Sequence, residues 1–179
     1  MKMYYVRHGQ TDWNLARKMQ GGQTERNLNE TGKEQAEQTR QELADVKYDI
    51  IICSPMERAK ETARIISQGR NVPMITDERL RERKLGEMEG NPITEECEKL
   101  IWDYNKNVEI KGGESLSEFE KRVLDFLEEA KNKYENDTIL VVAHGGVAKV
   151  IKSYLYGKPK DNNLTNYQMK NCEIIEAEF

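Results

Sequence analysis

The sequence predicts a three-layer α/β sandwich in which helices cover both faces of a mostly parallel central sheet. Short β-rich runs alternate along the chain with stretches of helical periodicity, an order typical of parallel sheets. Residues 50–52 and 139–142 are continuously apolar, as expected for strands that are buried on both faces. The 179 residues suit one ordinary domain, so we expect residues 1–179 to fold as a single unit.

Five short runs have the composition of strands. They contain Val, Ile, Tyr or Thr, which fit the pleated surface of a sheet. The expected strands are residues 4–6, 48–53, 72–76, 138–143 and 173–177. Cys53 ends the second run and is expected to be a buried strand residue.

Capping signals predict the first two helices. Thr31 and Glu34 have the spacing of a capping box, in which each side chain bonds the backbone N–H of the other residue. Ser54 is expected to cap the next helix, with Pro55 in its first turn and Glu57 completing a second box.

The last two helices have clearer boundaries. Ser115 and Glu118 form a third capping-box pattern, and the apolar spacing after them defines the clearest amphipathic helix of the chain. Its expected buried face consists of Leu116, Phe119, Val123, Phe126, Leu127 and Ala130. A further helix is expected over residues 145–156, because Gly157 and Pro159 would end it.

Residues 91–113 form the least regular part of the chain. Apolar residues there, Trp102 and Tyr104 among them, are mixed with many charges. The segment is expected to be a lid that sets substrate specificity or a surface helix followed by a loop. Trp102 and Tyr104 are expected to pack in the core or the lid rather than to contact a ligand.

Composition excludes several functional classes. Charged residues make up 34% of the chain, yet the net charge is only −4, and no dense run of Lys and Arg suggests a nucleic-acid binder. The three cysteines are far apart and form no CxxC pair, which favours a reducing compartment over a disulfide framework or a zinc site. No apolar run is long enough for a membrane span or a signal peptide, so we expect a cytoplasmic protein without membrane partners.

Polar residues able to bind or attack a phosphoryl group follow three of the expected strands. The first strand runs into Arg7-His8-Gly9, the second into Ser54 with Arg58 one turn later, and the fourth into His144. Ligands of open α/β sheets bind at the carboxyl ends of strands, so these side chains are expected to converge. Both histidines of the protein stand at such ends.

These residues carry a family resemblance. Residues 7–11, with Asn14 following, resemble the signature of the histidine phosphatase superfamily, which includes the cofactor-dependent phosphoglycerate mutases. Later segments are similar to the family's further motifs and follow in the same order: residues 54–59 with 62–63, residues 80–83 with Gly86, Glu89 and Gly90, residues 113–115, and residues 142–146.

Phosphoryl transfer requires a nucleophile in line with phosphorus and fixed positive charge around the phosphoryl oxygens. His8 is the expected nucleophile, and Arg7 and Arg58 are the expected forked donors, since a guanidinium binds such oxygens in a planar geometry. The resemblance implies that His144 is a further phosphate donor and that Glu82 protonates the leaving group. The two arginines and His144 would take the place of a metal ion, so no metal or cofactor is expected.

The resemblance also indicates residues around this centre. Asn14 is expected to add a neutral hydrogen bond, and Gly145 to lie at the phosphate site. Gln20, Gly21 and Arg83 occupy substrate-side positions in the resemblance, where a functional role and an ordinary structural role are equally compatible with the sequence.

The resulting hypothesis is a phosphatase that hydrolyses small phosphorylated metabolites through a phosphohistidine. A phosphoglycerate mutase is the alternative, but residues 90–113 leave little room for the long insertions with which such mutases enclose their phosphorylated state. A non-catalytic phosphate-binding module would be expected to lack a nucleophile or an acid, whereas His8 and Glu82 are both present. A zinc hydrolase is disfavoured because two histidines have no third ligand at a recognisable spacing. The sequence leaves the substrate and the oligomeric state open.

Overall fold

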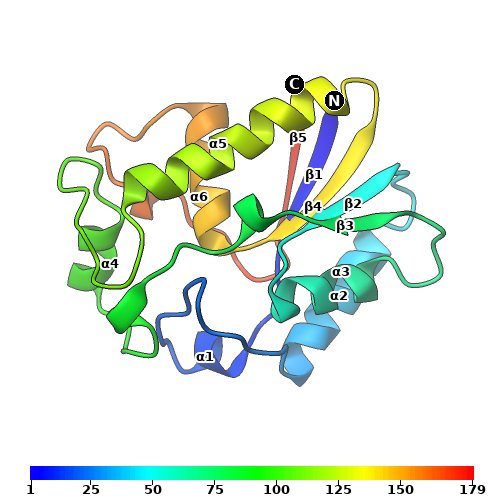
Figure 1. The fold of residues 1–179 in the computed structure, drawn as a ribbon. Coiled ribbons are helices and arrows are strands. Elements are labelled where there is room, and N and C mark those ends of the chain that lie inside the picture. The colour runs from blue at the N-terminus through cyan, green and yellow to red at the C-terminus, as the bar shows by residue number, and fades with distance from the viewer.

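A five-stranded sheet lies at the centre of the computed structural model, which describes residues 1–179 (Figure 1). Its spatial order is β3-β2-β4-β1-β5. The strands are β1 (Lys2–Arg7), β2 (Ile50–Cys53), β3 (Met74–Thr76), β4 (Thr138–Ala143) and β5 (Ile174–Glu178). All neighbours are parallel except β5, which is antiparallel to β1. All five expected strands are therefore confirmed.

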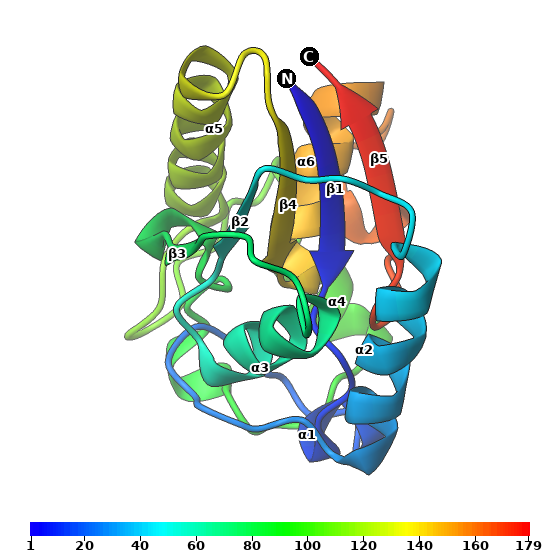
Figure 2. The same ribbon diagram turned by 90° about the vertical axis from the view of Figure 1, so that its right-hand side faces the viewer.

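Helices cover both faces of this sheet, which confirms the three-layer α/β/α prediction. The longer helices are α2 (Glu30–Glu42), α3 (Glu57–Ile66), α5 (Leu116–Lys133) and α6 (Gly145–Tyr156). Figure 2 shows α2 and α3 on one face and α5 and α6 on the other. Short elements surround the site described below: α1 (Asp12–Leu15), α4 (Glu95–Ile101), and 3₁₀ turns at Glu78–Leu80, Gly86–Met88 and Leu164–Asn166.

The core divides into two apolar layers because side chains alternate along each strand. Tyr5 and Val141 are fully buried in the layer beneath α5 and α6. Val6 and Leu140, their neighbours along β1 and β4, are buried in the layer beneath α2 and α3. This double coverage explains why the central strands are continuously apolar.

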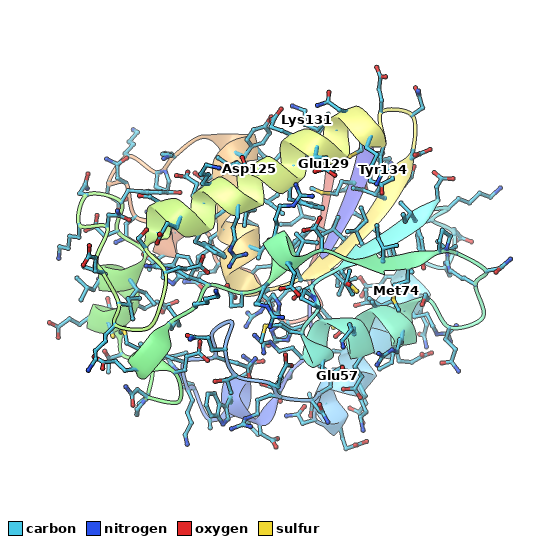
Figure 3. All side chains as sticks on the ribbon, in the orientation of Figure 1. Glu57, Met74, Asp125, Glu129, Lys131 and Tyr134 are labelled. Atoms are coloured by element: carbon cyan, nitrogen blue, oxygen red, sulfur yellow. The ribbon has the colours of Figure 1, made fainter.

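Helix α5 has the predicted start and the predicted buried face. Ser115 accepts a hydrogen bond from the Glu118 backbone N–H, and the Glu118 carboxylate accepts one from the Ser115 backbone. The outer side is charged, and Figure 3 shows Asp125, Glu129 and Lys131 along it. No helix of the protein is both long enough and apolar enough to cross a membrane.

The predicted caps of α2 and α3 are wrong. Helix α2 begins earlier than expected, because the Asn29 side chain accepts a hydrogen bond from the Gly32 backbone N–H. Helix α3 has Met56 as its N-cap residue and no side-chain cap. The Ser54 hydroxyl lies 2.7 Å from His144 Nε2 and accepts locally only from the Met56 backbone N–H, at 3.3 Å, so it contacts a distant residue but does not cap α3.

Candidate active site

Three strand ends bring the predicted catalytic residues to one edge of the sheet. Arg7 at the end of β1 is in register with Ala143 at the end of β4. Cys53 at the end of β2 is in register with Val142. His8, Ser54 and His144 each follow one of these strands directly, so the parallel register places them together.

His8 is held in one tautomer. Its Nδ1 lies 2.7 Å from the carbonyl oxygen of Gly9. A carbonyl oxygen only accepts, so Nδ1–H is the donor and Nε2 carries the lone pair. Burial lowers the pKa of His8 well below its ordinary value, and the charges of Arg58 and Arg7 lower it further. The imidazole is therefore neutral at neutral pH, the state that a nucleophile needs.

His144 is buried beside His8, with 5.2 Å between the ring centroids. The Arg58 Nε donates to Nδ1 of His144 at 3.3 Å, so the opposite nitrogen, Nε2, carries the proton. That nitrogen lies 2.7 Å from the Ser54 hydroxyl oxygen, to which it donates. Burial, followed by the charge of Arg58, keeps the pKa of His144 well below its ordinary value. Ser54 thus orients His144, a role that its own strand-end position did not reveal.

The Arg58 guanidinium is fully buried. Its Nη1 donates to the Thr24 carbonyl at 2.9 Å, and its Nη2 donates to the Gly21 carbonyl at 3.1 Å. Burial lowers the pKa of Arg58 to about 10, so the group still carries its charge at neutral pH. Gly21 acts on the site through this carbonyl and does not line the cavity described below.

Arg7 lines the cavity described below, and its charge acts on both buried histidines. Its Nη1 donates to the Met169 carbonyl at 2.5 Å, while its buried Nε has no partner. Gly145 permits the approach of the guanidinium, because a Cβ at that position would lie 3.3 Å from Nε. A buried donor without a partner is a suitable contact for an anionic ligand.

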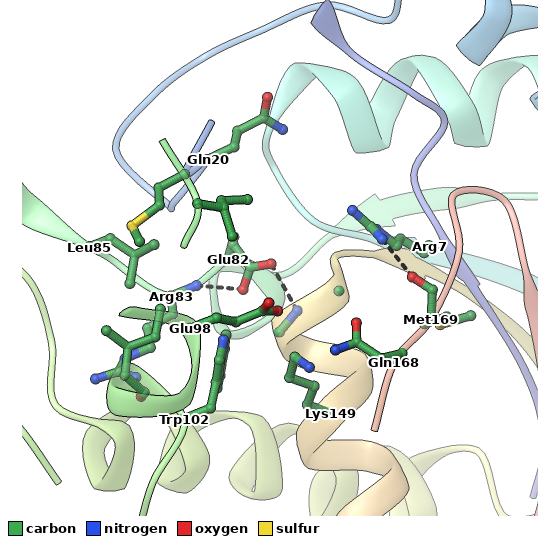
Figure 4. A pocket seen from close by; sticks show the side chains of 15 residues that line it. Arg7, Gln20, Glu82, Arg83, Leu85, Glu98, Trp102, Lys149, Gln168 and Met169 are labelled. Atoms are coloured by element: carbon green, nitrogen blue, oxygen red, sulfur yellow. Dashed lines mark hydrogen bonds between the residues drawn. The ribbon is translucent and has the colours of Figure 1, made fainter. Parts of the chain in front are cut away.

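Glu82 lies across the cavity from Arg7 and is 8% exposed. One carboxylate oxygen accepts from the Arg83 backbone N–H at 2.8 Å, and the other accepts from the Gly146 backbone N–H at 2.9 Å (Figure 4). These two bonds fix the carboxyl at the amino end of α6. Glycine is required at 146, since a Cβ there would lie 2.2 Å from Glu82 Oε1 and 2.7 Å from the Trp102 ring.

A cavity of about 130 Å³ opens between these groups. The predicted site residues that line it are Arg7, Gln20, Glu82, Arg83 and Gly145. His8, Arg58 and His144 are buried and are not among the residues that line it. Sequence reasoning assigned no role to Met19, Leu85, Gly146, Lys149, Gln168 and Met169, which also line it.

Three other predictions have distinct outcomes. Asn14 is not part of the lining, and its Oδ1 accepts from the Thr11 backbone N–H at 3.1 Å in the capping box of α1. The segment 91–113 contains α4 and contributes Ile93, Glu98, Ile101 and Trp102 to the cavity wall. Trp102 packs against Phe119 as expected, with 6.0 Å between the ring centroids, but it also faces the cavity, where only packing was expected.

Gln20 and Arg83 both make hydrogen bonds within the protein. Gln20 Oε1 accepts from the Thr11 hydroxyl at 2.7 Å, which leaves its buried Nε2 without a partner. The Arg83 guanidinium donates to the carbonyls of Glu114 and Ile101. The buried Nη2 of Arg83 also has no partner, so both side chains retain a donor within the cavity wall.

Comparison with known protein families agrees with the order of the sequence motifs and with the arrangement of the site residues. A family model described as the histidine phosphatase superfamily, branch 1, matches residues 3–179. The chain belongs to the histidine phosphatase superfamily. Its predicted membership is thereby confirmed.

Relatives within the superfamily bear both phosphatase and mutase names. An uncharacterized phosphatase PhoE of Bacillus subtilis is 34% identical, over 97% of this chain and 89% of its own length. A probable phosphoglycerate mutase GpmB of Erwinia tasmaniensis is 34% identical, over 99% and 85% of the two chains. Phosphoserine phosphatase 1 of Hydrogenobacter thermophilus is 35% identical, over 80% and 71%.

Solved structures show the same fold. YhfR of Bacillus stearothermophilus superposes with a TM-score of 0.88 at 30% identity, covering 99% of this chain and 90% of its own. A phosphoserine phosphatase from Entamoeba histolytica, solved in complex with 3-phosphoglyceric acid, gives a TM-score of 0.81 at 29% identity, covering 98% and 89%.

Proposed function

We propose that this protein is a phosphatase that hydrolyses small phosphomonoesters through a phosphohistidine on His8. The observation that supports this most directly is the His8 tautomer, in which Nδ1–H is bound to the Gly9 carbonyl and Nε2 carries the lone pair. The buried Arg58 and Arg7 supply positive charge around this nitrogen. A neutral nucleophile surrounded by fixed cations is suited to attack on a phosphate dianion.

In the first step, His8 Nε2 forms a bond to phosphorus while the bond from phosphorus to the ester oxygen breaks. Glu82 donates its proton to that oxygen, which leaves as an alcohol. In the second step, water attacks phosphorus, the P–N bond breaks and Glu82 takes up the proton. One carboxyl serves both steps because it lies on the leaving-group side of the cavity, opposite Arg7.

Positive charge on the protein replaces a metal ion in this mechanism. Arg7 and Arg58 each retain N–H groups that no protein acceptor uses, and these are the proposed donors to the phosphoryl oxygens. No group of three or more His, Cys, Asp or Glu side chains is arranged to hold a metal ion. Activity in the presence of excess chelator tests the proposed metal independence, and its loss and recovery on adding a divalent cation would contradict it.

A mutase is the second candidate, and a GpmB relative supports considering it. The same residues would serve, but the phosphoryl group would pass to another hydroxyl instead of to water. We favour water because the segment between Gly90 and Gly113 is short and leaves little room for insertions that would enclose a phosphorylated enzyme. The deciding experiment supplies 3-phosphoglycerate with its bisphosphate primer. Phosphate release is expected, and rapid isomerisation without phosphate release would identify a mutase.

A non-catalytic phosphate-binding module makes a different prediction. Such a protein would bind vanadate but release no phosphate from nitrophenyl phosphate or from a panel of phosphorylated metabolites. The phosphatase is expected to release phosphate from some of them, with His8→Ala as the inactive control. Absence of release across the whole panel, with vanadate binding intact, would replace the proposed function by this one.

A further inference from the structure

Lys149 is a buried cation that the proposed phosphoryl chemistry does not use. It lies on α6 four residues after Gly145, so both residues face the same cavity. The residue is only 5% exposed. Its Nζ donates to the carbonyls of Leu164 at 3.2 Å and Tyr167 at 3.1 Å. An ammonium has three N–H donors, so one remains for a ligand in the cavity.

The surroundings of Lys149 are those of a small polar subsite. Figure 4 shows its ammonium near Gln168 and Glu98, on the cavity side of Trp102. Glu98 forms no hydrogen bond or ion pair through its side chain, yet its charge acts on Lys149 more strongly than that of any other acidic residue. Burial lowers the pKa of Lys149 to about 8, so the ammonium keeps most of its charge at neutral pH with little water around it.

The cation of Arg83 does not belong to this subsite. The charges of Arg83 and Lys149 each lie 5.5 Å from the Trp102 ring centroid, and Figure 4 shows the ring between them. Lys149 is therefore the cation on the side of the cavity that also contains Arg7 and Glu82. A charged donor of this kind binds an anion, and a planar carboxylate matches an ammonium with one free N–H.

We propose that Lys149 anchors a carboxylate of the substrate, so that the preferred substrates are small phosphorylated amino or hydroxy acids. This inference rests on the proposed phosphatase function and adds a second point of attachment to it. In the proposed mechanism, Arg7 and Arg58 bind the phosphoryl group at His8, and the ester oxygen lies beside Glu82. A carboxylate a few bonds away then reaches Lys149 across a cavity of about 130 Å³, which suits a small molecule.

The alternative to this proposal is a structural role, in which Lys149 only ties α6 to the loop at residues 164–167. A structural role predicts that replacing Lys149 lowers kcat/KM equally for all substrates. An anchor predicts a loss confined to substrates that carry the carboxylate. The two explanations therefore differ in substrate selectivity rather than in overall activity.

The experiment uses two matched pairs of phosphomonoesters. O-phosphoserine is compared with O-phosphoethanolamine, which lacks the carboxylate, and 3-phosphoglycerate with glycerol 3-phosphate, in which CH₂OH replaces it. The purified protein is expected to prefer the carboxylate member of each pair in kcat/KM, about tenfold or more, as expected for one charged hydrogen bond. Lys149→Met should bring both ratios close to one, chiefly through KM, and Lys149→Arg should restore part of the preference.

Lys131→Met is the matched control, because Lys131 is on α5, outside the cavity, and the substitution removes the same charge. It is expected to keep both ratios. Ratios near one in the unmodified protein, or a Lys149→Met variant that keeps them, would overturn the proposal. Nitrophenyl phosphate is hydrolysed in parallel, so that a failure of the phosphatase function itself appears separately as absent phosphate release.

Discussion

The Gly146 backbone N–H donates to the Glu82 carboxylate at 2.9 Å and joins the proposed acid to the first turn of α6. The contact spans 64 residues of sequence. It depends on the absence of a side chain at 146, where a Cβ would lie within 2.2 Å of the carboxylate. The glycine therefore determines where the proposed proton donor lies.

Gly146→Ala should displace Glu82 and reduce turnover of substrates with strongly basic leaving groups. A loss of about 10²-fold or more is expected, which is the lower range of general acid catalysis. Gly145→Ala is the comparison, because its Cβ would lie 3.3 Å from Arg7 Nε, a much smaller overlap than the 2.2 Å approach at position 146. Steady-state kinetics with glycerol 3-phosphate measure both variants. Equal and small effects of the two substitutions would contradict the positional role of Gly146.

Glu82→Gln should slow the hydrolysis of glycerol 3-phosphate far more than that of nitrophenyl phosphate. A nitrophenolate leaves without a proton, whereas an alkoxide requires one, so only the second reaction depends on a carboxylic acid. The rate of phosphoenzyme formation for each substrate checks this. Equal losses for the two substrates would remove Glu82 from the role of leaving-group acid.

Ser54→Ala should destabilise the protein and disorient His144. The His144 Nε2–H would become a buried donor without an acceptor, which costs about 1–3 kcal/mol. Chemical denaturation measures the loss, with Ser67→Ala as the control, since that hydroxyl lies on the exposed end of α3. An unchanged free energy of unfolding together with unchanged kinetics would show that the Ser54 contact is dispensable.

Stability should fall as the pH drops below about 6.5. The folded-state pKa values of His8 and His144 are lowered, so the unfolded chain takes up protons in this range before the folded protein does. Each histidine then contributes a slope of about 1.4 kcal/mol per pH unit, between the unfolded pKa and the lower folded pKa, with stability rising toward neutral pH. Denaturation between pH 5 and 7 measures this for the unmodified protein and for His144→Gln. The same slope in both would contradict the assignment for His144.

Glu98→Gln should lower the preference for O-phosphoserine over 3-phosphoglycerate. The two substrates differ in an ammonium against a hydroxyl, and the unpaired Glu98 carboxylate beside Lys149 favours the cation. The ratio of their kcat/KM values is the readout. An unchanged ratio would place Glu98 outside the substrate contacts.

The fold and the catalytic residues at the strand ends could be predicted from the sequence, whereas most residues of the cavity wall could not. Apolar runs identify the central strands, and the motifs at Arg7, Arg58 and His144 follow directly from strand ends. The Ser54 contact with His144 joins residues 90 positions apart, and no local pattern encodes it. The same serine is a suitable cap by spacing alone, which is why the local prediction was wrong.

Several residues of the cavity wall were not predicted, because they too come together only through long-range contacts. Lys149 lies within a predicted helix, but the helical periodicity of the sequence does not predict which distant loops pack against that helix. Gln168 and Met169 reach the site from the segment before β5, and α4 is too short and too charged to give an apolar pattern. Such residues become visible only when the fold is known.

The phosphohistidine proposed on His8 can be detected by trapping the covalent intermediate. The protein is mixed with labelled substrate, quenched in alkali and digested, and the labelled peptide is identified. We expect an acid-labile, base-stable phosphoryl group on His8 that forms faster than turnover and is absent from His8→Ala. A label on His144 instead, or a His8→Ala variant that hydrolyses substrate at the unmodified rate, would contradict it.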